Sequence, residues 1–539
     1  MRAGRHAIRS IALVEPKGET LNVYSGIRIP RQGVVLLGTI LAERGYEVEV
    51  QVEEVQALDR SALVEADLVG ISLITPTAPR GYALADSLRR MGIPVVLGGY
   101  HPTFLPDESL SHADFVVRGE GEDTLVELVE ALNGHGDLSA IRGLSFHEGR
   151  ERVHNPARDL ECNLERFPIP DFSLVRGMRR GNVATVLTRR GCPFDCSFCC
   201  VAPFNEHRVR EVSVERVLAE VERQLPWVAD RGMLFFADDI FNLRPARMKA
   251  ILRGMIEHHL TPLWVAQVRH EAARDPELLD LMRRSNCGRV CVGFESVNAE
   301  TLVSYGKQET LAEVVAATAA FHRANIKVHG MFVLGSDEDT VATVYETCRF
   351  AIEHDLDSMQ MNILTPLPGS RLFTETAQEP HRQLPASWAQ YDGGHAVHVP
   401  KRISPAELQE HVTTALLRFY SLGRAFRRLL ERDAAEAAIR VFGWWLTHRA
   451  ARDFRAHARW LRSLTEPAPD GLDQRVVGRR RRPSRGERGG EKPPRPARGV
   501  LGCWVHALGR TVAWGLSAVR PRSPIRLAYF LHGRRRLHA

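Results

Sequence analysis

The chain has 539 residues, of which 44% are hydrophobic and 25% charged, and its formal net charge is +7. This length accommodates two to four domains, and the composition is that of an ordinary globular chain, which excludes a wholly disordered protein. Much of the positive excess lies in residues 478–498 and 531–539 rather than along the whole chain. That distribution favours a solvated linker or an anionic membrane surface and argues against a nucleic-acid partner.

Nine cysteines occur in the chain, and four of them lie between Cys192 and Cys200. Nine is an odd number and too few for a disulfide scaffold, so the dense group indicates metal ligands in a reducing compartment, and we expect a cytoplasmic protein. The basic N-terminus has only a short apolar stretch before Glu15, which predicts a first strand rather than a signal peptide. No run of about 18 uncharged apolar residues occurs in the sequence, so no membrane-spanning helix is predicted.

Residues 8–135 alternate short apolar strands with amphipathic helices that end at glycines such as Gly45 and Gly92. This alternation predicts an α/β domain with a doubly wound, Rossmann-like parallel sheet, in which ligands bind outside the carboxyl ends of the strands. The predicted strands are residues 10–15, 46–52, 66–74, 93–99 and 114–122.

Residues 136–180 show little periodicity and are expected to connect two domains, and a second α/β series occupies residues 181–400. Asp275 and Pro276 are expected to begin one of its helices, with Gly288 just past the helix end. Six strand–helix units in series predict a partial (β/α)6 barrel of the TIM type with its chemistry at the carboxyl ends of the strands. The predicted strands are residues 183–188, 232–237, 263–267, 289–294, 327–333 and 358–363.

The C-terminal part is predicted to be an α-helical extension over residues 401–465, because Ser404 opens a capping box with proline at the first turn. Residues 466–498 are rich in Pro, Gly and Arg, which predicts a disordered basic linker. Residues 499–539 form an amphipathic basic tail. Two interpretations of its apolar part stay open: a helix at a membrane interface, or a helix packed on the protein.

Cys192, Cys196 and Cys199 lie on one loop immediately after the strand at 183–188. Three thiolates with this spacing can hold three irons of a four-iron cubane and leave the fourth iron open. The open iron can take the amino and carboxylate groups of S-adenosylmethionine (SAM), and an electron passed to the sulfonium then releases a 5′-deoxyadenosyl radical.

A zinc site or free thiols are the alternatives to a cluster. Zinc usually takes four ligands, often from paired C-x-x-C units, and no second pair with that spacing occurs. Cys200 does not fit the triad and is interpreted as a neighbour of the ligands. Cys287, Cys291 and Cys348 fall within helix or strand patterns and are expected to be small core residues.

This three-cysteine loop after the first strand of a six-unit series resembles the radical SAM superfamily. The resemblance implies a [4Fe–4S] cluster on Cys192, Cys196 and Cys199 with SAM on its open iron. Further contacts with SAM are implied at the ends of the strands, where Asp239 or Asp238 matches the groups that bind the methionine amine. The implied cofactor-binding residues are Phe198, Asp238, Asp239, Gln267, Arg269, Glu295, Ser296 and Gly335.

Glycine-rich turns end two strands of the N-terminal domain, and glycines let the backbone approach a large flat ligand. These turns, placed ahead of a radical SAM domain, resemble the cobalamin-binding domain of one large class, so cobalamin is implied as a third cofactor. The implied contacts are Ser72, Thr75, Gly98, Gly99, His101, Gly119, Glu120 and Gly121.

Many cobalamin domains carry Asp-x-His-x-x-Gly after the first strand, but no histidine occurs between His6 and His101 here. We therefore expect cobalamin without a histidine below the cobalt, which in this family would favour homolytic methyl donation. His101 has two interpretations, an axial ligand or a turn histidine that contacts backbone. The domain could also have lost its cofactor and serve only as a scaffold.

The resemblance implies an enzyme that methylates an unactivated carbon, with methylcobalamin as the methyl donor and a second SAM to remethylate it. The segment with Trp388, residues 391–395 and residues 419–421 resembles an extension of members that act on hopanoids, tetrapyrroles and other hydrophobic metabolites. A lipid-like small molecule is the expected substrate, flavodoxin or ferredoxin the expected electron donor, and peripheral membrane contact through the tail a further expectation. Cyclisation, rearrangement or oxidation with the same cofactors is one alternative, and a cobalamin carrier or sensor with a vestigial radical domain is another.

Overall fold

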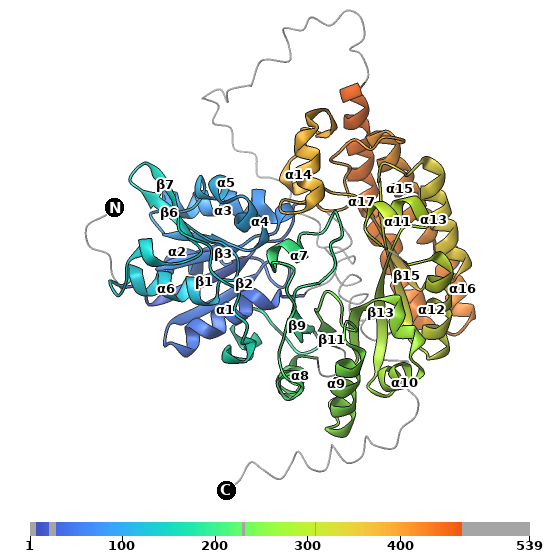
Figure 1. Ribbon diagram of the computed structural model, residues 1–539, viewed down its shortest axis with the longest axis horizontal. Helices are drawn as coiled ribbons and strands as arrows, with labels where there is room; N and C mark the ends of the chain where they lie inside the picture. Colours follow the sequence, from blue (N-terminus) through green and yellow to red (C-terminus); the bar gives the residue numbers. More distant parts are fainter. Residues whose placement is uncertain (1–6, 21–28, 229–231, 308, 466–539) are drawn as a thin grey trace, which may run out of the picture.

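A computed structural model describes residues 7–20, 29–228, 232–307 and 309–465 of the chain. Two largely parallel sheets dominate it, one in the N-terminal third and one in the middle, and helices follow at the C-terminal end (Figure 1). The short elements β9 and α7 lie between the two sheets in this view.

The N-terminal sheet has seven strands in the order β2-β1-β3-β4-β5-β6-β7. The first five are parallel, and their order 2-1-3-4-5 is a doubly wound arrangement, as expected, with its switch point between β1 and β3. Their bounds are β1 Ser10–Glu15, β2 Glu47–Val52, β3 Leu68–Ser72, β4 Val95–Gly98 and β5 Phe115–Val117.

Helices cover both faces of this sheet because its strands are apolar on both sides. One core packs α1 and α6 against the sheet, and a second core packs α3 against the opposite face. The helices of this part are α1 Gln32–Glu43, α2 Arg60–Glu65, α3 Ala78–Arg90, α4 Tyr100–Phe104, α5 Pro106–Leu110 and α6 Glu122–Leu132.

The segment 136–180 is more regular than its sequence indicated. Strands β6 (Leu144–Glu148) and β7 (Glu151–His154) form an antiparallel hairpin that extends the N-terminal sheet beyond β5. The expectation of little regular structure is therefore wrong for these strands. They are short, and only β6 turns a mostly buried face to the core, so their alternation gives a weak signal.

The second sheet has six strands in sequence order, β8-β11-β12-β13-β14-β15, and every neighbouring pair is parallel. This confirms the predicted partial (β/α)6 barrel. The bounds are β8 Val183–Val186, β11 Met233–Phe236, β12 Trp264–Val268, β13 Cys287–Glu295, β14 Lys327–Leu334 and β15 Ser358–Ile363.

Helices follow the strands of this barrel and share one large core with it. Asp275 caps α10 by accepting a hydrogen bond from the Leu278 N–H, as predicted. Gly288, however, lies inside β13, and α10 ends at Arg284 before Asn286 turns the chain with a φ of 73°. The helices are α7 Val201–Phe204, α8 Val214–Val228, α9 Pro245–Glu257, α10 Pro276–Arg284, α11 Ala299–Ser304, α12 Leu311–Arg323, α13 Val341–Glu353 and α14 Arg371–Gln378.

Three helices complete the described chain: α15 (Pro405–Phe419), α16 (Leu422–Leu430) and α17 (Ala434–Thr465). Ser404 and Glu407 form the predicted capping box at the start of α15. An ion pair of 2.6 Å between the buried side chains of Arg289 in β13 and Glu436 in α17 ties this extension to the barrel. No helix within the described residues is long and apolar enough to cross a membrane. The predicted linker at 466–498 and tail at 499–539 lie outside the described residues.

The turn after β4 leaves no space for a side chain at Gly99. Its φ is +100°, and a Cβ there would lie 2.6 Å from the carbonyl oxygen of Leu73. Gly92 has a similar φ of +83° but no atom within 4 Å of the same position. We expect Gly99→Ala to lower the melting temperature more than Gly92→Ala, which carries only the roughly 1–2 kcal/mol of a left-handed backbone. Equal melting temperatures in thermal denaturation would show that no clash exists.

Candidate active site

The cysteine loop leaves the carboxyl end of β8 and runs into α7. Cys192, Cys196 and Cys199 are all half-buried on it. The Cys199 N–H donates to the Cys196 carbonyl at 3.0 Å, and the Val201 N–H donates to the Cys199 sulfur at 3.4 Å. Gly191 allows the loop to begin, because a Cβ there would lie 2.1 Å from the Arg208 carbonyl oxygen.

Burial raises the pKa of each thiol on the loop, to about 12 for Cys199 and about 11 for Cys200. Bound iron favours the thiolate and offsets this cost. Within the described residues, no three His, Cys, Asp or Glu side chains converge on a point that would hold a single metal ion. A cubane distributes three thiolates over three irons, so three half-buried thiols spread along one loop fit it.

The three cysteines that were expected in the core divide into two groups. Cys287 and Cys348 are buried core residues, as expected. Cys291 is only half-buried. It lies on the opposite face of β13 from Val290 and Val292, which pack into the core between the strands and the surrounding helices. The expectation of a core residue is therefore wrong for Cys291, whose side chain faces the barrel interior.

The two aspartates after β11 have different surroundings. Asp238 is fully buried and accepts hydrogen bonds from the Thr188 N–H at 2.7 Å, the Thr188 hydroxyl and the Arg189 N–H. Asp239 faces solvent but is surrounded by protein, and this partial desolvation raises its pKa to about 6. Its charge also raises the pKa of Cys192 and Cys199. Asp239 thus lies at the cluster loop, whereas Asp238 fastens the start of that loop to the barrel.

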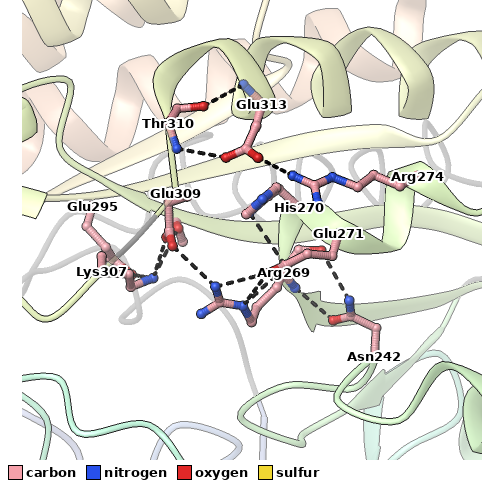
Figure 2. Close-up of polar contacts among 11 residues, drawn as sticks. Asn242, Arg269, His270, Glu271, Arg274, Glu295, Lys307, Glu309, Thr310 and Glu313 are labelled. Carbon is pink, nitrogen blue, oxygen red and sulfur yellow. Dashed lines mark hydrogen bonds and ion pairs between the residues drawn. The ribbon is translucent and has the colours of Figure 1, made fainter.

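Charged side chains meet at the ends of β12 and β13 (Figure 2). Arg269 pairs with Glu271 at 3.0 Å and Glu309 at 3.2 Å, and Lys307 pairs with Glu295 at 3.0 Å and Glu309 at 3.1 Å. Burial lowers the pKa of Lys307, but Glu295 and Glu309 more than offset this and hold it above its ordinary value. Charges of both signs beside Cys196 suit a zwitterionic ligand such as the methionine part of SAM.

Glu295 owes its direction to a break in the β13 ladder. The pairing with β14 shifts between Gly293 and Glu295, and Glu295 has a φ of 57°. Such bulges re-aim side chains next to active sites. Ser296 follows it but is buried, and its hydroxyl accepts a hydrogen bond from the Asn298 N–H, so it serves the local turn. Gln267 lies half-buried on β12, on the face toward the barrel interior.

Phe198 and Gly335 lie at the far side of the loop. The Phe198 ring packs edge-on against Tyr305 at 5.0 Å, in a small apolar cluster with Val333 and Leu364. Gly335 has a φ of +102°, and a Cβ would lie 2.6 Å from a Leu408 methyl carbon. Phe198 thus belongs to an apolar cluster that packs against the cluster loop, and the role of both residues toward an adenine ring stays a prediction.

The two glycine turns of the N-terminal domain lie together at the carboxyl edge of its sheet. The Thr103 hydroxyl donates to the Gly99 carbonyl at 2.7 Å and accepts from the Gly119 N–H at 2.9 Å, which joins the turns. Ser72 ends β3 nearby, and its carbonyl accepts a hydrogen bond from Arg31. Gly98 and Gly121 complete the surface that sequence analysis assigned to the corrin.

His101 and Thr75 are placed differently from that assignment. His101 is completely buried, with one ring nitrogen 3.3 Å from the Thr75 hydroxyl and the other 3.4 Å from Glu108. Trp388 donates to the same Glu108 carboxylate at 2.9 Å. Both nitrogens of His101 are therefore engaged within the protein, which contradicts an axial-ligand role in this conformation and fits a turn histidine.

Glu120 also serves a purpose that the sequence did not indicate. Its carboxylate accepts from Arg190 and from Arg210, each at 2.7 Å, and neighbouring Glu122 accepts from Arg190 at 2.6 Å. Arg190 in β9 (Arg189–Arg190) and Arg210 in β10 (Arg210–Glu211) flank the cluster loop. The Glu120 carboxylate is thus committed to ion pairs between the domains, and only its main chain stays available for the predicted corrin contact.

Sequence reasoning missed Lys307, Glu309, Arg190 and Arg210 as members of the site. Arg190 stands two residues before Cys192, and Lys307 follows Gly306, whose φ is +76°. A charged residue next to a metal ligand or after a turn glycine could have indicated a site residue, but the sequence does not show which residue it pairs with. Tyr100 was also missed: its ring stacks on Phe204 of α7 at 4.2 Å and lies near Cys199 and Cys200.

Two family models match the chain. The model described as "B12 binding domain" matches residues 19–129, and "Radical SAM superfamily" matches residues 186–351. A structure of the radical SAM methyltransferase TsrM from Kitasatospora setae, with cobalamin and a [4Fe–4S] cluster bound, superposes with a TM-score of 0.62 at 18% identity. The superposition covers 85% of this chain and 100% of that one and shows the shared fold.

Three curated relatives resemble the chain over most of its length. An uncharacterized methyltransferase of Pyrococcus horikoshii is 29% identical over 77% of this chain and 93% of its own. A bacteriochlorophyllide d C-12(1)-methyltransferase of Chlorobaculum tepidum is 27% identical over 74% of this chain and 84% of its own. An anaerobic magnesium-protoporphyrin IX monomethyl ester cyclase of Cereibacter sphaeroides is 29% identical over 66% of this chain and 60% of its own.

The chain combines a doubly wound sheet that ends in glycine turns with a half-barrel that presents a three-cysteine loop. This combination defines an enzyme that uses cluster-bound SAM together with a corrin. The chain belongs to the cobalamin-binding radical SAM enzymes. Its cofactors are accordingly a [4Fe–4S] cluster, SAM and cobalamin.

Replacing the loop cysteines tests the ligand assignment. We expect Cys192→Ala, Cys196→Ala and Cys199→Ala each to remove the cluster, because two thiolates cannot hold the cubane on its remaining irons. Cys200→Ala, one residue further along the same loop, is the matched control and should keep it. Iron and sulfide are measured after anaerobic purification. Equal loss of iron from Cys200→Ala would show that the triad is misassigned.

The adjacent aspartates give a second test with an internal control. Asp239→Asn should leave the fold intact and weaken SAM binding by about 10- to 100-fold, the value of a charge-assisted hydrogen bond. Asp238→Asn should instead lower the free energy of unfolding by about 1–3 kcal/mol, because it removes a buried acceptor of three hydrogen bonds. Equilibrium binding of SAM and chemical denaturation separate the two, and the reverse pattern would exchange their roles.

Proposed function

We propose that the protein transfers a methyl group to an unactivated carbon of a hydrophobic small molecule. The observation that carries this proposal is the contact between the two cofactor-binding edges. Tyr100, at the glycine turn after β4, stacks on Phe204 directly behind the cluster loop. A corrin on these turns would therefore lie beside the cluster, which a methyl transfer to a substrate radical requires.

The chain's own residues would bind and orient the reactants. When bound, the cluster and SAM supply the radical that abstracts a hydrogen atom, and cobalamin supplies the methyl group. Cys192, Cys196 and Cys199 hold the cluster, Asp239 accepts hydrogen bonds from the methionine amine, and the charges around Lys307 fix the rest of the methionine part. The wall formed by Phe198 and Tyr305 keeps water from the adenine.

The barrel interior supports a hydrophobic substrate. Uncharged half-buried side chains that point inward are Phe235 in β11, Cys291 in β13 and Met331 in β14, and the charge of Arg289 on the same face of β13 is paired with Glu436. Burial lowers the pKa of the inward-facing His329 to about 4 and raises that of Cys291 to about 11, so both are neutral near pH 7. Such a lining disfavours charged substrates and suits the tetrapyrrole or lipid class.

The cyclase relative keeps a second outcome open, since cyclisation, rearrangement or oxidation could follow the same hydrogen abstraction. A cobalamin carrier or sensor with a vestigial radical domain is less well supported, because the three cysteines and the Asp239 edge are all present. A flavodoxin or ferredoxin is the proposed electron donor.

Peripheral membrane contact is proposed as well, and its predicted site in the C-terminal tail lies outside the described residues. The basic composition of residues 478–498 and 531–539 supports attraction to anionic lipid. Sedimentation of the full chain with and without vesicles of anionic phospholipid tests this point.

Isotope transfer distinguishes the chemical outcomes. Cells that express the protein anaerobically are fed methionine with a trideuterated methyl group, and their lipid and pigment extracts are compared with those of cells expressing Cys196→Ala. Methylation predicts a product heavier by one labelled methyl group, together with 5′-deoxyadenosine and S-adenosylhomocysteine from the purified enzyme. Formation of 5′-deoxyadenosine without S-adenosylhomocysteine or label would favour cyclisation or oxidation. Absence of both nucleoside products would support the carrier alternative.

A further inference from the structure

The cluster loop is held from outside the barrel by two acidic residues of the N-terminal domain. Glu120 and Glu122 stand at the turn between β5 and α6, and Arg190 and Arg210 stand on the strands that flank the loop. The four side chains are between 5% and 19% exposed. We call them the interdomain ion cluster.

The interdomain ion cluster has a specific geometry. One oxygen of Glu120 accepts from Arg190 and the other from Arg210, both at 2.7 Å, so a single carboxylate joins the two flanking strands. Burial alone would raise the pKa of Glu120, but Arg210 and Arg190 more than offset it and hold the carboxylate in its charged form. Each arginine also has another partner: Arg190 donates to Glu122 and Arg210 to Asn205.

Glu120 stands between two glycines of the proposed corrin surface. Gly119, with a φ of +74°, precedes it, and Gly121 follows. Arg190 lies two residues before the first cluster ligand, Cys192. The side chain of Glu120 therefore links two segments of main chain: the turn that would contact the corrin and the loop that holds the iron–sulfur cluster.

We infer that Glu120 is a positioning residue that couples corrin binding to the order of the cluster loop. This inference rests on the proposed placement of cobalamin at the Gly119–Gly121 turn. A corrin bound at that turn would reduce the motion of the turn. Because the two arginines pair with Glu120, they would reduce the motion of β9 and β10 as well, and so hold the cluster loop in one position relative to the corrin. Apolar contacts also join the domains, namely the Tyr100–Phe204 stack and the packing of Val212 after β10, but they lack the direction of the charge-assisted hydrogen bonds to Glu120.

Glu120→Gln tests the coupling with little change of shape. Arg190 keeps its ion pair with Glu122, whereas Arg210 keeps only hydrogen bonds to the Asn205 side chain and the Glu161 carbonyl, so thermal denaturation is used to verify that the variant is folded. Glu127→Gln is the matched control, since Glu127 lies on the same α6 and pairs with Arg158, away from the barrel. Arg190→Lys is a second variant, which keeps the charge but lacks the planar guanidinium whose two terminal nitrogens reach Glu120 and Glu122 separately.

The measurement is hydrogen–deuterium exchange of the full chain, anaerobically reconstituted with iron and sulfide, with and without hydroxocobalamin. In the unmodified protein, cobalamin should slow exchange about fivefold both over residues 98–122 and over residues 186–212. In Glu120→Gln and Arg190→Lys the first protection should remain and the second should be lost, while Glu127→Gln should behave like the unmodified protein. A merely structural role of Glu120 would change exchange equally with and without cobalamin.

Several outcomes would overturn the inference. Undiminished protection of residues 186–212 in Glu120→Gln would show that the coupling takes another route. No protection of that segment in the unmodified protein would show that there is no coupling, and no change over residues 98–122 would remove the corrin placement itself. An enzyme that shows the coupling but transfers no methyl group would refute the proposed function and leave this inference intact.

Discussion

Parallel strands end at a common edge, and in this chain two such edges meet at one loop. The glycine turns after β4 and β5 contact the segment that carries Cys192, Cys196 and Cys199, through Tyr100 on one side and Glu120 on the other. At such edges the strands end and the helices that follow them begin, so main-chain groups without ladder partners and helix N-termini face the same side, which is where ligands of α/β proteins bind. The meeting of the edges is therefore what brings two cofactors within reach of one substrate.

The contact between the edges is partly ionic, and this has a cost. Removing charged groups from water is expensive, so a buried group of two arginines and two glutamates is weak evidence for stability. Apolar residues of the same size would hold the domains together at least as firmly. What charges add is direction, because a carboxylate that accepts from two guanidinium groups fixes both in one arrangement. That argues for precise placement of the loop rather than for adhesion between domains.

The sequence predicted the architecture well because periodicity and order along the chain carry it. Both parallel sheets, the Asp275 cap and the Ser404 capping box appear in the structure as predicted. The β6–β7 hairpin was missed because each strand is too short to show a pattern, and Gly288 was misplaced because a glycine in a strand looks the same as one after a helix.

The site residues were harder to predict, because a polar residue at a strand end can serve either a ligand or the fold. Asp238 and Asp239 are adjacent in sequence, yet one fastens Thr188 and Arg189 and the other faces the cluster loop. His101 and Glu120 sit in the right turns but turn inward to Thr75 and across to the arginines. Only partners from distant parts of the chain decide between these roles.

His101 and Glu120, whose side chains both turn away from the predicted corrin surface, have a feature in common. Each links the N-terminal turns to another part of the molecule: His101 through Glu108 to Trp388, and Glu120 to the strands beside the cluster. The residues of these turns thus include glycines, which carry no side chain, and larger polar residues, which anchor the turns to other parts of the molecule. These anchoring residues hold the turns from behind the glycines, and a binding surface gains precision when a second layer of residues fixes it in this way.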